Sequence, residues 1–254
     1  MKCDPVEHLR KPILIAGPCT IESEQQILKI STEISSMGIK FLRGGAFKPR
    51  TSPKTFQGLE RPGLEYMRKA ADLNGMFVVS EVLESRQLDE CYDLIDVIQI
   101  GSRSMTAYGF LKYVGEVSSR DKKPVLLKRG MFSTINEMLL AAEYILEKGN
   151  PNLLLCLRGI RTFEQIDSVF RFTPDLADIL ELKDKTELPV IFDPSHSAGN
   201  SKYVSQLSRA ALGLGADGLI IECHYNPSEA LIDGDQCIQH SQLKEIVDSI
   251  SELS

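Results

Sequence analysis

Four side chains in the sequence have the chemistry of ligands for a divalent transition metal; three closely follow short apolar runs, and the fourth lies in the loop after the last run. They are one thiol, one imidazole and two carboxylates, contributed by Cys19, His196, Glu222 and Asp233. A mixed set of sulfur, nitrogen and oxygen donors suits Mn, Fe, Co or Zn. A lone cysteine, however, is most often a small core residue. The metal interpretation therefore requires the four residues to meet in space.

Two neighbours of Glu222 also have metal-binding chemistry. Cys223 follows Glu222 directly, so in a strand its side chain should point to the opposite face. His224 follows by two residues and shares the side of Glu222. His224 is therefore a reserve ligand or a candidate general acid–base, and Cys223 is left out.

Eight basic residues follow the same kind of apolar run, several beside Gly or Pro in short loops. They are Arg43, Lys48, Arg50, Arg103, Lys128, Arg129, Arg158 and Arg161. An exposed helix face explains most single Lys or Arg residues, but clustered cations repel one another unless an anion lies between them. Arginine binds phosphate and carboxylate oxygens in bidentate geometry, and lysine adds a point charge. The set predicts a substrate carrying more than one phosphate or carboxylate.

The segment after Arg43 adds backbone and hydroxyl donors to these cations. Gly44 and Gly45 allow the backbone to approach a ligand closely, and Thr51 and Ser52 supply hydroxyl groups. The sequence contains no Walker loop, nucleophile elbow or zinc-protease signature, and no GxGxxG turn follows the first apolar run. A dinucleotide site is therefore unsupported.

Short apolar runs of four or five residues must position these groups. They cover 13–17, 39–42, 76–80, 96–100, 124–128, 153–156, 189–192 and 218–221. Runs this rich in Val, Ile and Leu are typical of strands buried on both faces of a parallel sheet. Amphipathic segments that predict helices lie between or after them, at 23–38, 63–75, 85–94, 135–150, 202–216 and 243–253.

Eight strand–helix units in about 250 residues favour a (β/α)8 TIM barrel over the competing open doubly wound sheet. Such barrels carry their catalytic groups at the carboxyl ends of the strands, where the polar residues named above fall. We expect a single catalytic barrel over 1–254, with a short N-terminal extension at 1–12 and no added regulatory domain. A homo-oligomer is expected only from the family resemblance described below.

Composition excludes several other classes of protein. The chain has 254 residues, 43% of them hydrophobic, and a net charge of −6 with no basic block, so a nucleic-acid partner is not expected. No apolar stretch reaches the roughly 18–20 residues that cross a membrane, and no signal peptide is recognised. Six cysteines without a CxxC pair predict reduced thiols and a cytoplasmic protein.

The sequence resembles the 3-deoxy-7-phosphoheptulonate synthases, in the short form that shares a core with the 3-deoxy-octulosonate 8-phosphate synthases. The matching segments span 13 to about 237 and include AGPCTIES, LRGGAFKPRTSPKTFQGL, KPVLLKRGM, FDPSHSAGN and GADGLIIECHYNP. KPRTSP is the most specific, because the octulosonate enzymes are expected to carry a KANRSS-like segment there.

The resemblance implies roles for particular residues. Cys19, His196, Glu222 and Asp233 would bind the divalent metal, and Lys48, Cys19 and His196 would be catalytic. Phosphoenolpyruvate would be held by Arg103, Lys128 and Arg158, with Arg43 and Lys48 beside them. Erythrose 4-phosphate would be received by Lys48, Pro49, Arg50, Thr51 and Ser52.

The implied activity is that of a metal-dependent transferase of the aldolase type. Phosphoenolpyruvate, erythrose 4-phosphate and water would give 3-deoxy-D-arabino-heptulosonate 7-phosphate and phosphate, the first step of the shikimate pathway to aromatic amino acids. Leu157, Ser80 and the loop residues Ser104, Ala107 and Tyr108 depart from the family pattern. These departures bear on the sugar acceptor and on the pocket beside Arg158.

Three alternatives remain open from the sequence. The same chemistry could use another aldose phosphate, such as arabinose 5-phosphate. The chain could be a non-catalytic descendant that regulates a partner enzyme. It could also be a Schiff-base aldolase with Lys128 as nucleophile, because neighbouring cations lower the pKa of a lysine.

Overall fold

Eight parallel strands close into a barrel in which each strand pairs with the next along the chain and β8 pairs with β1. The computed structural model describes residues 4–9, 11–48, 52, 54–163 and 172–251. The strands are β1 (Ile13–Gly17), β2 (Phe41–Arg43), β3 (Phe77–Val82), β4 (Val97–Ile100), β5 (Val125–Lys128), β6 (Leu153–Leu157), β7 (Val190–Phe192) and β8 (Gly218–Glu222). The predicted TIM barrel is confirmed, and the open sheet is excluded.

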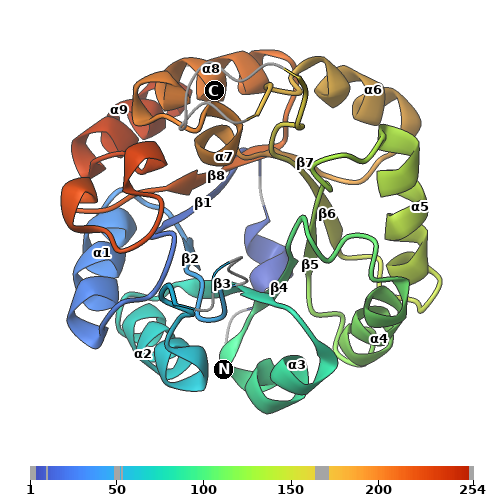
Figure 1. The fold of residues 1–254 in the computed structure, drawn as a ribbon, viewed down its shortest axis with the longest axis horizontal. Helices are drawn as coiled ribbons and strands as arrows, with labels where there is room; N and C mark the ends of the chain where they lie inside the picture. The colour runs from blue at the N-terminus through green and yellow to red at the C-terminus, as the bar shows by residue number, and fades with distance from the viewer. Residues whose placement is uncertain (1–3, 10, 49–51, 53, 164–171, 252–254) are drawn as a thin grey trace.

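Helices form a ring outside the strands (Figure 1). They are α1 (Glu24–Ser36), α2 (Glu60–Leu73), α3 (Ser85–Cys91), α4 (Tyr108–Ser118), α5 (Ile135–Leu146), α6 (Ala177–Lys185), α7 (Pro194–Ala198), α8 (Val204–Gly213) and α9 (His240–Ser251). Five short 3₁₀ helices in the described residues complete the secondary structure, namely η1 (Pro5–His8), η2 (Tyr92–Leu94), η3 (Ser201–Tyr203), η4 (Pro227–Glu229) and η5 (Gly234–Gln236). The six helices predicted by residue range are confirmed, while α4, α6 and α7 lie in segments for which no range was predicted.

Side-chain caps fix where several helices begin. Ser23 accepts a hydrogen bond from the Gln26 backbone N–H at the start of α1. Thr134 and Glu137 form a reciprocal capping box at the start of α5. Asp193 caps α7, a short helix that carries His196 at the mouth of the barrel. The Asp193 cap therefore helps to fix the position of His196, a predicted metal ligand.

The barrel interior contains a small apolar core, with a layer of mostly polar residues next to it at the carboxyl ends of the strands. Its apolar residues are Ile13, Ile15, Phe41, Phe77, Val79, Val97, Leu126, Leu154, Cys156, Ile191 and Ile220. Because side chains alternate along a strand, the residue two positions further on also points inward, nearer the carboxyl ends. These residues are Gly17, Arg43, Glu81, Gln99, Lys128, Arg158, Asp193 and Glu222. We call this set the mouth layer.

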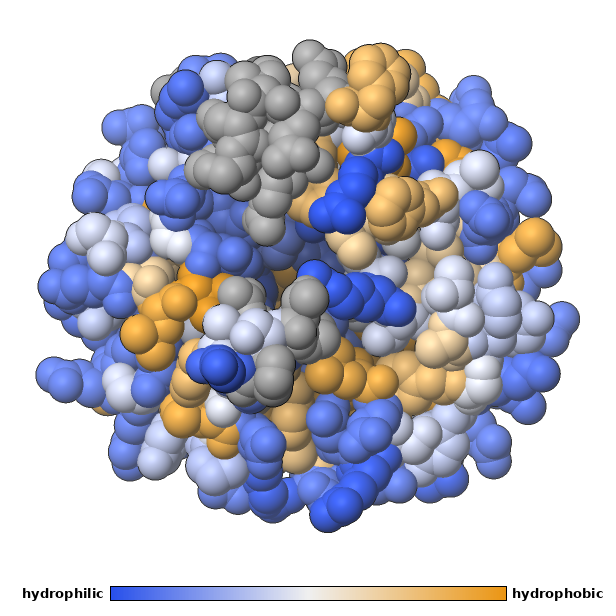
Figure 2. Space-filling view, in the orientation of Figure 1, coloured by the Kyte–Doolittle hydropathy of each residue, from blue (hydrophilic) through white to orange (hydrophobic). Residues whose placement is uncertain are grey.

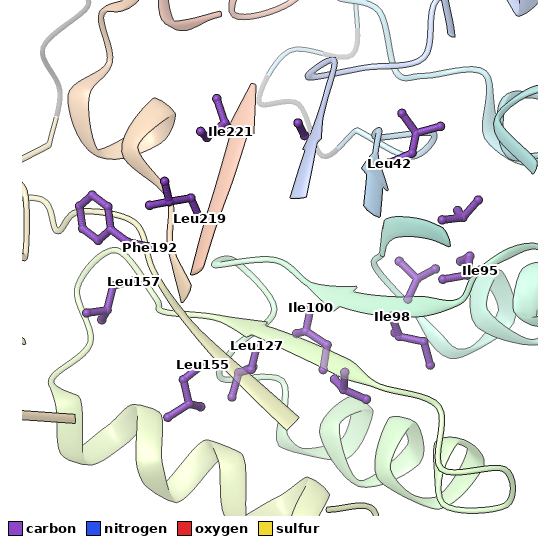
Figure 3. Close-up of a cluster of buried hydrophobic side chains, with 14 of the residues drawn as sticks. Leu42, Ile95, Ile98, Ile100, Leu127, Leu155, Leu157, Phe192, Leu219 and Ile221 are labelled. Atoms are coloured by element: carbon purple, nitrogen blue, oxygen red, sulfur yellow. The ribbon is translucent and has the colours of Figure 1, made fainter. Parts of the chain in front are cut away.

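A larger apolar core lies between the outer face of the barrel and the helices. Figure 3 shows part of it, with Leu127, Leu155, Leu157 and Phe192 among the labelled side chains. These residues alternate with the inward-facing ones along the same strands. Burial of this second set holds the helices against the barrel and so fixes the positions of the loops that follow each strand.

The amino-terminal end of the barrel is covered by η1. The His8 ring lies 5.1 Å from that of Phe77, and Leu9 packs on the interior core. The mouth layer is therefore at the opposite, open end. Among the described residues, no helix combines the length and apolar character needed to span a membrane.

Candidate active site

Part of the mouth layer lines a polar cavity of about 120 Å³ at the carboxyl ends of the strands, through Arg43, Glu81, Gln99, Lys128 and Arg158. The surface of this face is hollowed near its centre, where hydrophilic residues gather (Figure 2). Five cationic side chains line the cavity: Arg43, Lys48, Arg103, Lys128 and Arg158. Arg43, Lys128 and Arg158 are only 4–5% exposed. Arg43 and Lys128 pair with the buried carboxylates Glu222 and Asp193, and the five cations together suit the cavity to an anionic ligand.

Three of the four predicted metal ligands meet beside this cavity. The donor atoms of Cys19, Glu222 and Asp233 all lie within 4.8 Å of one another. His196 stands at the edge of the cluster, with its Nε2 atom 3.8 Å from Glu222 Oε1. A thiol, two carboxylates and an imidazole at this spacing fit a divalent transition metal.

Close backbone packing brings the loop that carries Cys19 against β2. A side chain at Gly17 would place its Cβ only 2.0 Å from the Arg43 carbonyl oxygen, so this approach requires glycine. The same loop is tied to the one after β8, because Glu22 accepts a hydrogen bond of 2.8 Å from the Leu231 backbone N–H. The two loops thereby bring Cys19 and Asp233 together.

Asp233 adopts a left-handed backbone conformation, with φ 56° and ψ 32°. Aspartate visits this region more readily than most residues, at some cost in energy. Its carboxylate accepts a hydrogen bond of 3.4 Å from the Cys19 sulfur. The backbone strain therefore lies at a residue that is predicted to be a metal ligand.

Glu222 is fully buried, and both of its carboxylate oxygens have partners. Arg43 donates to Oε1, and Gln236 donates to Oε2 at 2.6 Å. Burial alone would raise the pKa of Glu222, but His196 and Arg43 outweigh this effect and hold the pKa well below its usual range. The carboxylate is therefore ionised and fixed in orientation.

Lys48 joins the cation cavity to the metal-donor cluster. Its ammonium group donates to the Cys19 carbonyl oxygen at 2.9 Å and to the Cys19 sulfur at 3.2 Å. Burial would lower the pKa of Lys48, but Cys19 and Glu222 raise it above its ordinary value. Burial raises the pKa of the Cys19 thiol, and Glu222 adds to the rise. Lys48 is thus a protonated donor beside a protonated thiol.

Asp193 is a second buried carboxylate of the mouth layer. Its Oδ2 atom accepts from the Lys128 ammonium group and contacts His196 Nδ1 at 2.8 Å. Burial alone would raise the pKa of Asp193, but His196 and Lys128 hold it well below the usual range. The ionised carboxylate can only accept, so His196 Nδ1 carries the hydrogen of this contact, and Nε2 faces the metal-donor cluster.

Two further basic residues of the predicted set, Arg129 and Arg161, are not among the described residues that line the cavity. Arg129 points away from Lys128 and pairs with Asp175 at 3.0 Å and with Asp178. Arg161 is exposed, with its guanidinium carbon 5.5 Å from the Phe132 ring centre. The expectation that Arg129 belongs to the anion-binding group is wrong, because acidic neighbours engage it. Arg161 also lies 5.8 Å from the ring centre of Phe172, which lines the cavity, and its part in anion binding stays a prediction.

The KPRTSP segment is only partly described. Pro49, Arg50 and Thr51 lie outside the described residues. Ser52 is exposed and is not among the residues that line the cavity. The predicted contacts of these four residues with the sugar phosphate stay predictions.

The structure also places Cys223 and His224, the two neighbours of Glu222 that have metal-binding chemistry. Cys223 packs in the outer core, as its place in the strand predicted. His224 lies apart from the described metal-donor cluster, and its Nδ1 accepts a 3.0 Å hydrogen bond from the Asn226 backbone N–H. A reserve-ligand role for His224 is therefore not supported.

The departures from the family pattern avoid the donor cluster and the cavity. Leu157 faces the outer core, so it is not part of the pocket beside Arg158 (Figure 3). Ser80 donates a 2.8 Å hydrogen bond to the Gly44 carbonyl oxygen, and Tyr108 stacks on Tyr144. None of the three lines the cavity.

Four residues of the site were not predicted from the sequence: Glu81, Gln99, Asp193 and Gln236. The first three belong to the mouth layer, and Gln99 donates to Glu81 at 3.3 Å. The sequence could have indicated these three residues, because each lies two residues beyond an inward-facing apolar residue of its strand. Gln236 follows Asp233 by three residues in a short helical turn and has no such signal.

A barrel with a cation-lined cavity beside a cluster of metal donors defines an enzyme that acts on small anionic substrates. Residues 9–254 match the family described as "DAHP synthetase I family", and the chain belongs to this family.

Comparison with individual relatives gives the same result. A phospho-2-dehydro-3-deoxyheptonate aldolase from Thermotoga maritima is 45% identical over 241 residues, covering 95% of this chain and 69% of the relative. Its crystal structure superposes with a TM-score of 0.89, again over 95% of this chain and 69% of that one. A truncated form of the Thermotoga maritima 3-deoxy-D-arabino-heptulosonate 7-phosphate synthase gives 0.85 at 41% identity, with 95% and 86% covered.

A more distant group of relatives has a different name. A 2-dehydro-3-deoxyphosphooctonate aldolase from Hydrogenovibrio crunogenus is 30% identical over 260 residues, covering 94% of this chain and 90% of the relative. The similarity in sequence is therefore greater to the heptonate relative than to this octonate relative.

Proposed function

We propose that the protein condenses phosphoenolpyruvate with erythrose 4-phosphate and water to give 3-deoxy-D-arabino-heptulosonate 7-phosphate and inorganic phosphate. The observation that carries the proposal is the placement of five cations around one cavity that adjoins Cys19, Glu222 and Asp233. Membership of the family and 45% identity to a heptonate aldolase support the same reaction.

Phosphoenolpyruvate carries a phosphate and a carboxylate on three carbons, which suits a small cavity lined by several cations. Lys128 and Arg158 are held in the buried floor, and Arg103 is exposed at the rim. Together they would hold the two anionic groups, with Arg43 and Lys48 beside them. Binding would add ion pairs between the substrate and these cations and would place the enol carbon in a fixed orientation.

Erythrose 4-phosphate is the proposed acceptor because the segment after Lys48 reads KPRTSP. We propose that Arg50 and Thr51 bind its phosphate. The octonate relative at 30% identity makes arabinose 5-phosphate the second candidate. The greater identity to the heptonate relative favours the four-carbon sugar.

Metal dependence is part of this proposal, with Cys19, His196, Glu222 and Asp233 as ligands. The donor set fits Mn, Fe, Co or Zn, since it combines a thiol, an imidazole and two carboxylates. When bound, such an ion would supply Lewis-acid polarisation of the aldehyde carbonyl or activation of water.

The residues of the chain would then stabilise the charges of the reacting groups and supply a proton. The enol carbon of phosphoenolpyruvate forms a bond to the aldehyde carbon, water adds to the neighbouring carbon, and phosphate leaves with its bridging oxygen. Lys48 is placed to donate a proton to the new alkoxide, since its ammonium group stands between the cavity and Cys19. His196 donates through Nδ1 to Asp193 and is a poor free base.

The Schiff-base alternative is less favoured by this geometry. Lys128 is hydrogen-bonded to Asp193 as an ammonium group, which suits an anion-binding charge better than an amine nucleophile. The regulatory alternative is also less favoured, because a non-catalytic descendant has no need to keep the donor cluster and the buried cations together.

A phosphate-release assay tests the proposal. The purified protein is stripped with EDTA, supplied with Mn²⁺ and phosphoenolpyruvate, and given erythrose 4-phosphate or arabinose 5-phosphate in parallel. We expect release with the four-carbon sugar, little with the five-carbon sugar, and none before metal is restored. Faster release with arabinose 5-phosphate would reassign the acceptor, and no release with either sugar would favour the regulatory alternative.

We propose in addition that the enzyme is a cytoplasmic homodimer or homotetramer and serves the shikimate pathway. The family supports these assignments, and the five described cysteines are free thiols, as expected in a reducing compartment. Light scattering on the purified protein measures the oligomeric state.

A further inference from the structure

The carboxylate of Asp193 connects the two halves of the site. It is fully buried, and its Oδ2 atom accepts from Lys128, which lines the anion cavity. The same oxygen accepts from His196 Nδ1 at 2.8 Å, while Oδ1 accepts from the His196 backbone N–H at 2.9 Å. One carboxylate therefore holds a substrate-binding cation and a metal-donor imidazole.

We infer that Asp193 is a positioning residue that couples binding of phosphoenolpyruvate to binding of the metal. The inference rests on the proposed function, because it takes Lys128 as a ligand of the substrate and His196 as a ligand of the metal. It goes beyond that function by assigning an energetic link to a residue that contacts neither ligand.

Competition for one oxygen provides the link. In the structure, Lys128 and His196 share Asp193 Oδ2. When an anionic substrate engages the Lys128 ammonium group, less of the charge on Asp193 is neutralised, and the carboxylate becomes a stronger acceptor for His196 Nδ1–H. A stronger hydrogen bond at Nδ1 makes Nε2 a better metal ligand. Each ligand should therefore tighten binding of the other by the same factor.

A purely structural role for Asp193 is the competing explanation, since its Oδ1 atom caps α7. Asparagine caps helices about as well as aspartate. Asp193→Asn therefore can keep the cap through Oδ1 while replacing the shared acceptor Oδ2 with an amide NH₂. This substitution separates the two roles.

The experiment is a binding cycle without sugar, so that no turnover occurs. Isothermal titration measures the Kd of Mn²⁺ with and without saturating phosphoenolpyruvate, and the Kd of phosphoenolpyruvate with and without Mn²⁺. For the wild type we expect each ligand to tighten the other about fivefold or more, within the usual range of coupling between sites. For Asp193→Asn we expect both ligands to bind more weakly and the coupling factor to fall to about one.

Asp217→Asn is the matched control. Asp217 is also a buried carboxylate shared by two cations, Lys11 and Lys183, and it also accepts a backbone N–H, from Val190. It lies next to β8 at the amino-terminal end of the barrel, away from the mouth. This variant should lose stability but keep the wild-type coupling factor.

The outcomes separate the inference from the proposed function. Failure of the wild type to bind Mn²⁺ or phosphoenolpyruvate would overturn both. Binding of both ligands without coupling, or coupling that persists in folded Asp193→Asn, would overturn the inference alone.

A second measurement applies if Asp193→Asn does not fold. Histidine-selective ¹⁵N NMR of the metal-free wild type can follow its four histidines. Added phosphoenolpyruvate should shift Nδ1 of His196 and leave the ring of His240, on α9, unchanged. Equal shifts, or no shift at His196, would overturn the inference.

Discussion

The ammonium group of Lys48 lies 3.2 Å from the sulfur of Cys19, so a cation of the anion cavity directly contacts a metal-donor thiol. Lys48 thus stands where the proposed substrate and the proposed metal would meet. A hydrogen bond from an ammonium group stabilises a thiolate as well as a developing alkoxide. Lys48 would therefore have two roles, to stabilise the Cys19 thiolate and to stabilise the developing alkoxide, and the two can be measured separately.

Lys48→Met should lower kcat by about 10²–10⁴-fold, the usual contribution of a positioned proton donor. It should also weaken binding of Mn²⁺, because the thiolate loses its cationic neighbour. Steady-state phosphate release and Mn²⁺ titration measure the two effects. Lys54→Met, an exposed change in the same loop, should leave both values at wild-type level. An unchanged kcat in Lys48→Met would remove Lys48 from the chemistry.

Lys128 and Arg129 are adjacent, equally buried at 4% exposure, and point in opposite directions. Lys128→Met should weaken binding of phosphoenolpyruvate by about 2–5 kcal/mol, as expected when a buried charge partner is removed. Arg129→Met should leave this affinity nearly unchanged but cost about 3–5 kcal/mol of stability, because Asp175 stays buried without its cation. Calorimetric titration and chemical unfolding distinguish the two losses. The reverse pattern would contradict the assignment of Lys128.

Metal affinity should rise with pH. Burial raises the pKa of the Cys19 thiol, so near neutral pH the metal-free protein holds a proton there that ligation must displace. The apparent affinity should therefore increase about tenfold per pH unit between pH 6 and 8. Titration in two buffers of different ionisation enthalpy counts the proton released. Cys19→Ala should release none, and wild-type binding that is independent of pH would show that Cys19 is not a ligand.

Asp217 should make stability fall in acid. Burial alone would raise its pKa, but hydrogen bonds from Lys11 and Lys183 lower it below the ordinary value. A depressed folded-state pKa contributes stability that is present above the unfolded-state pKa of about 3.9 and is lost as pH falls through the folded value. The wild type should therefore lose stability more steeply than Asp217→Asn below about pH 4.

Urea unfolding from pH 7 down to pH 2.5 measures this difference. At pH 7, Asp217→Asn should be less stable by about 1–3 kcal/mol, since a buried polar network is disturbed. Asp248→Asn removes an exposed pair with Lys244 and should change stability by less than about 1 kcal/mol. Parallel pH curves for wild type and Asp217→Asn would contradict the account.

Much of the barrel could be predicted because its strands are buried on both faces. Continuous apolar runs marked each strand to within two residues at either end, as Ile13–Gly17 and Gly218–Glu222 illustrate. The α4 helix gave a weaker signal, since YGFLKYVGEVS contains two glycines and several β-branched or aromatic residues that are poor helix formers. Packing against α5 and the barrel, rather than local propensity, stabilises it.

The site was predicted in part, and the misses have physical causes. Cys19, Glu222 and Asp233 were predicted from their donor chemistry, at a strand end or in the loop that follows it, and the structure brings the three together. Asp193 was missed although it lies two residues past the inward-facing Ile191, because its role appears only when Lys128 and His196 are brought to it from different segments. Arg129 was misassigned because its partners Asp175 and Asp178 lie far along the chain.

The most direct test of the central claim is to locate the metal by anomalous diffraction from crystals grown with Mn²⁺ and phosphoenolpyruvate. We predict one ion bound by Cys19, His196, Glu222 and Asp233, at distances of about 2.0–2.3 Å to the sulfur, nitrogen and oxygen donors. Phosphoenolpyruvate should lie beside it, in contact with Lys128 and Arg158. An ion bound elsewhere, or a substrate outside the cavity that these two residues line, would contradict the account.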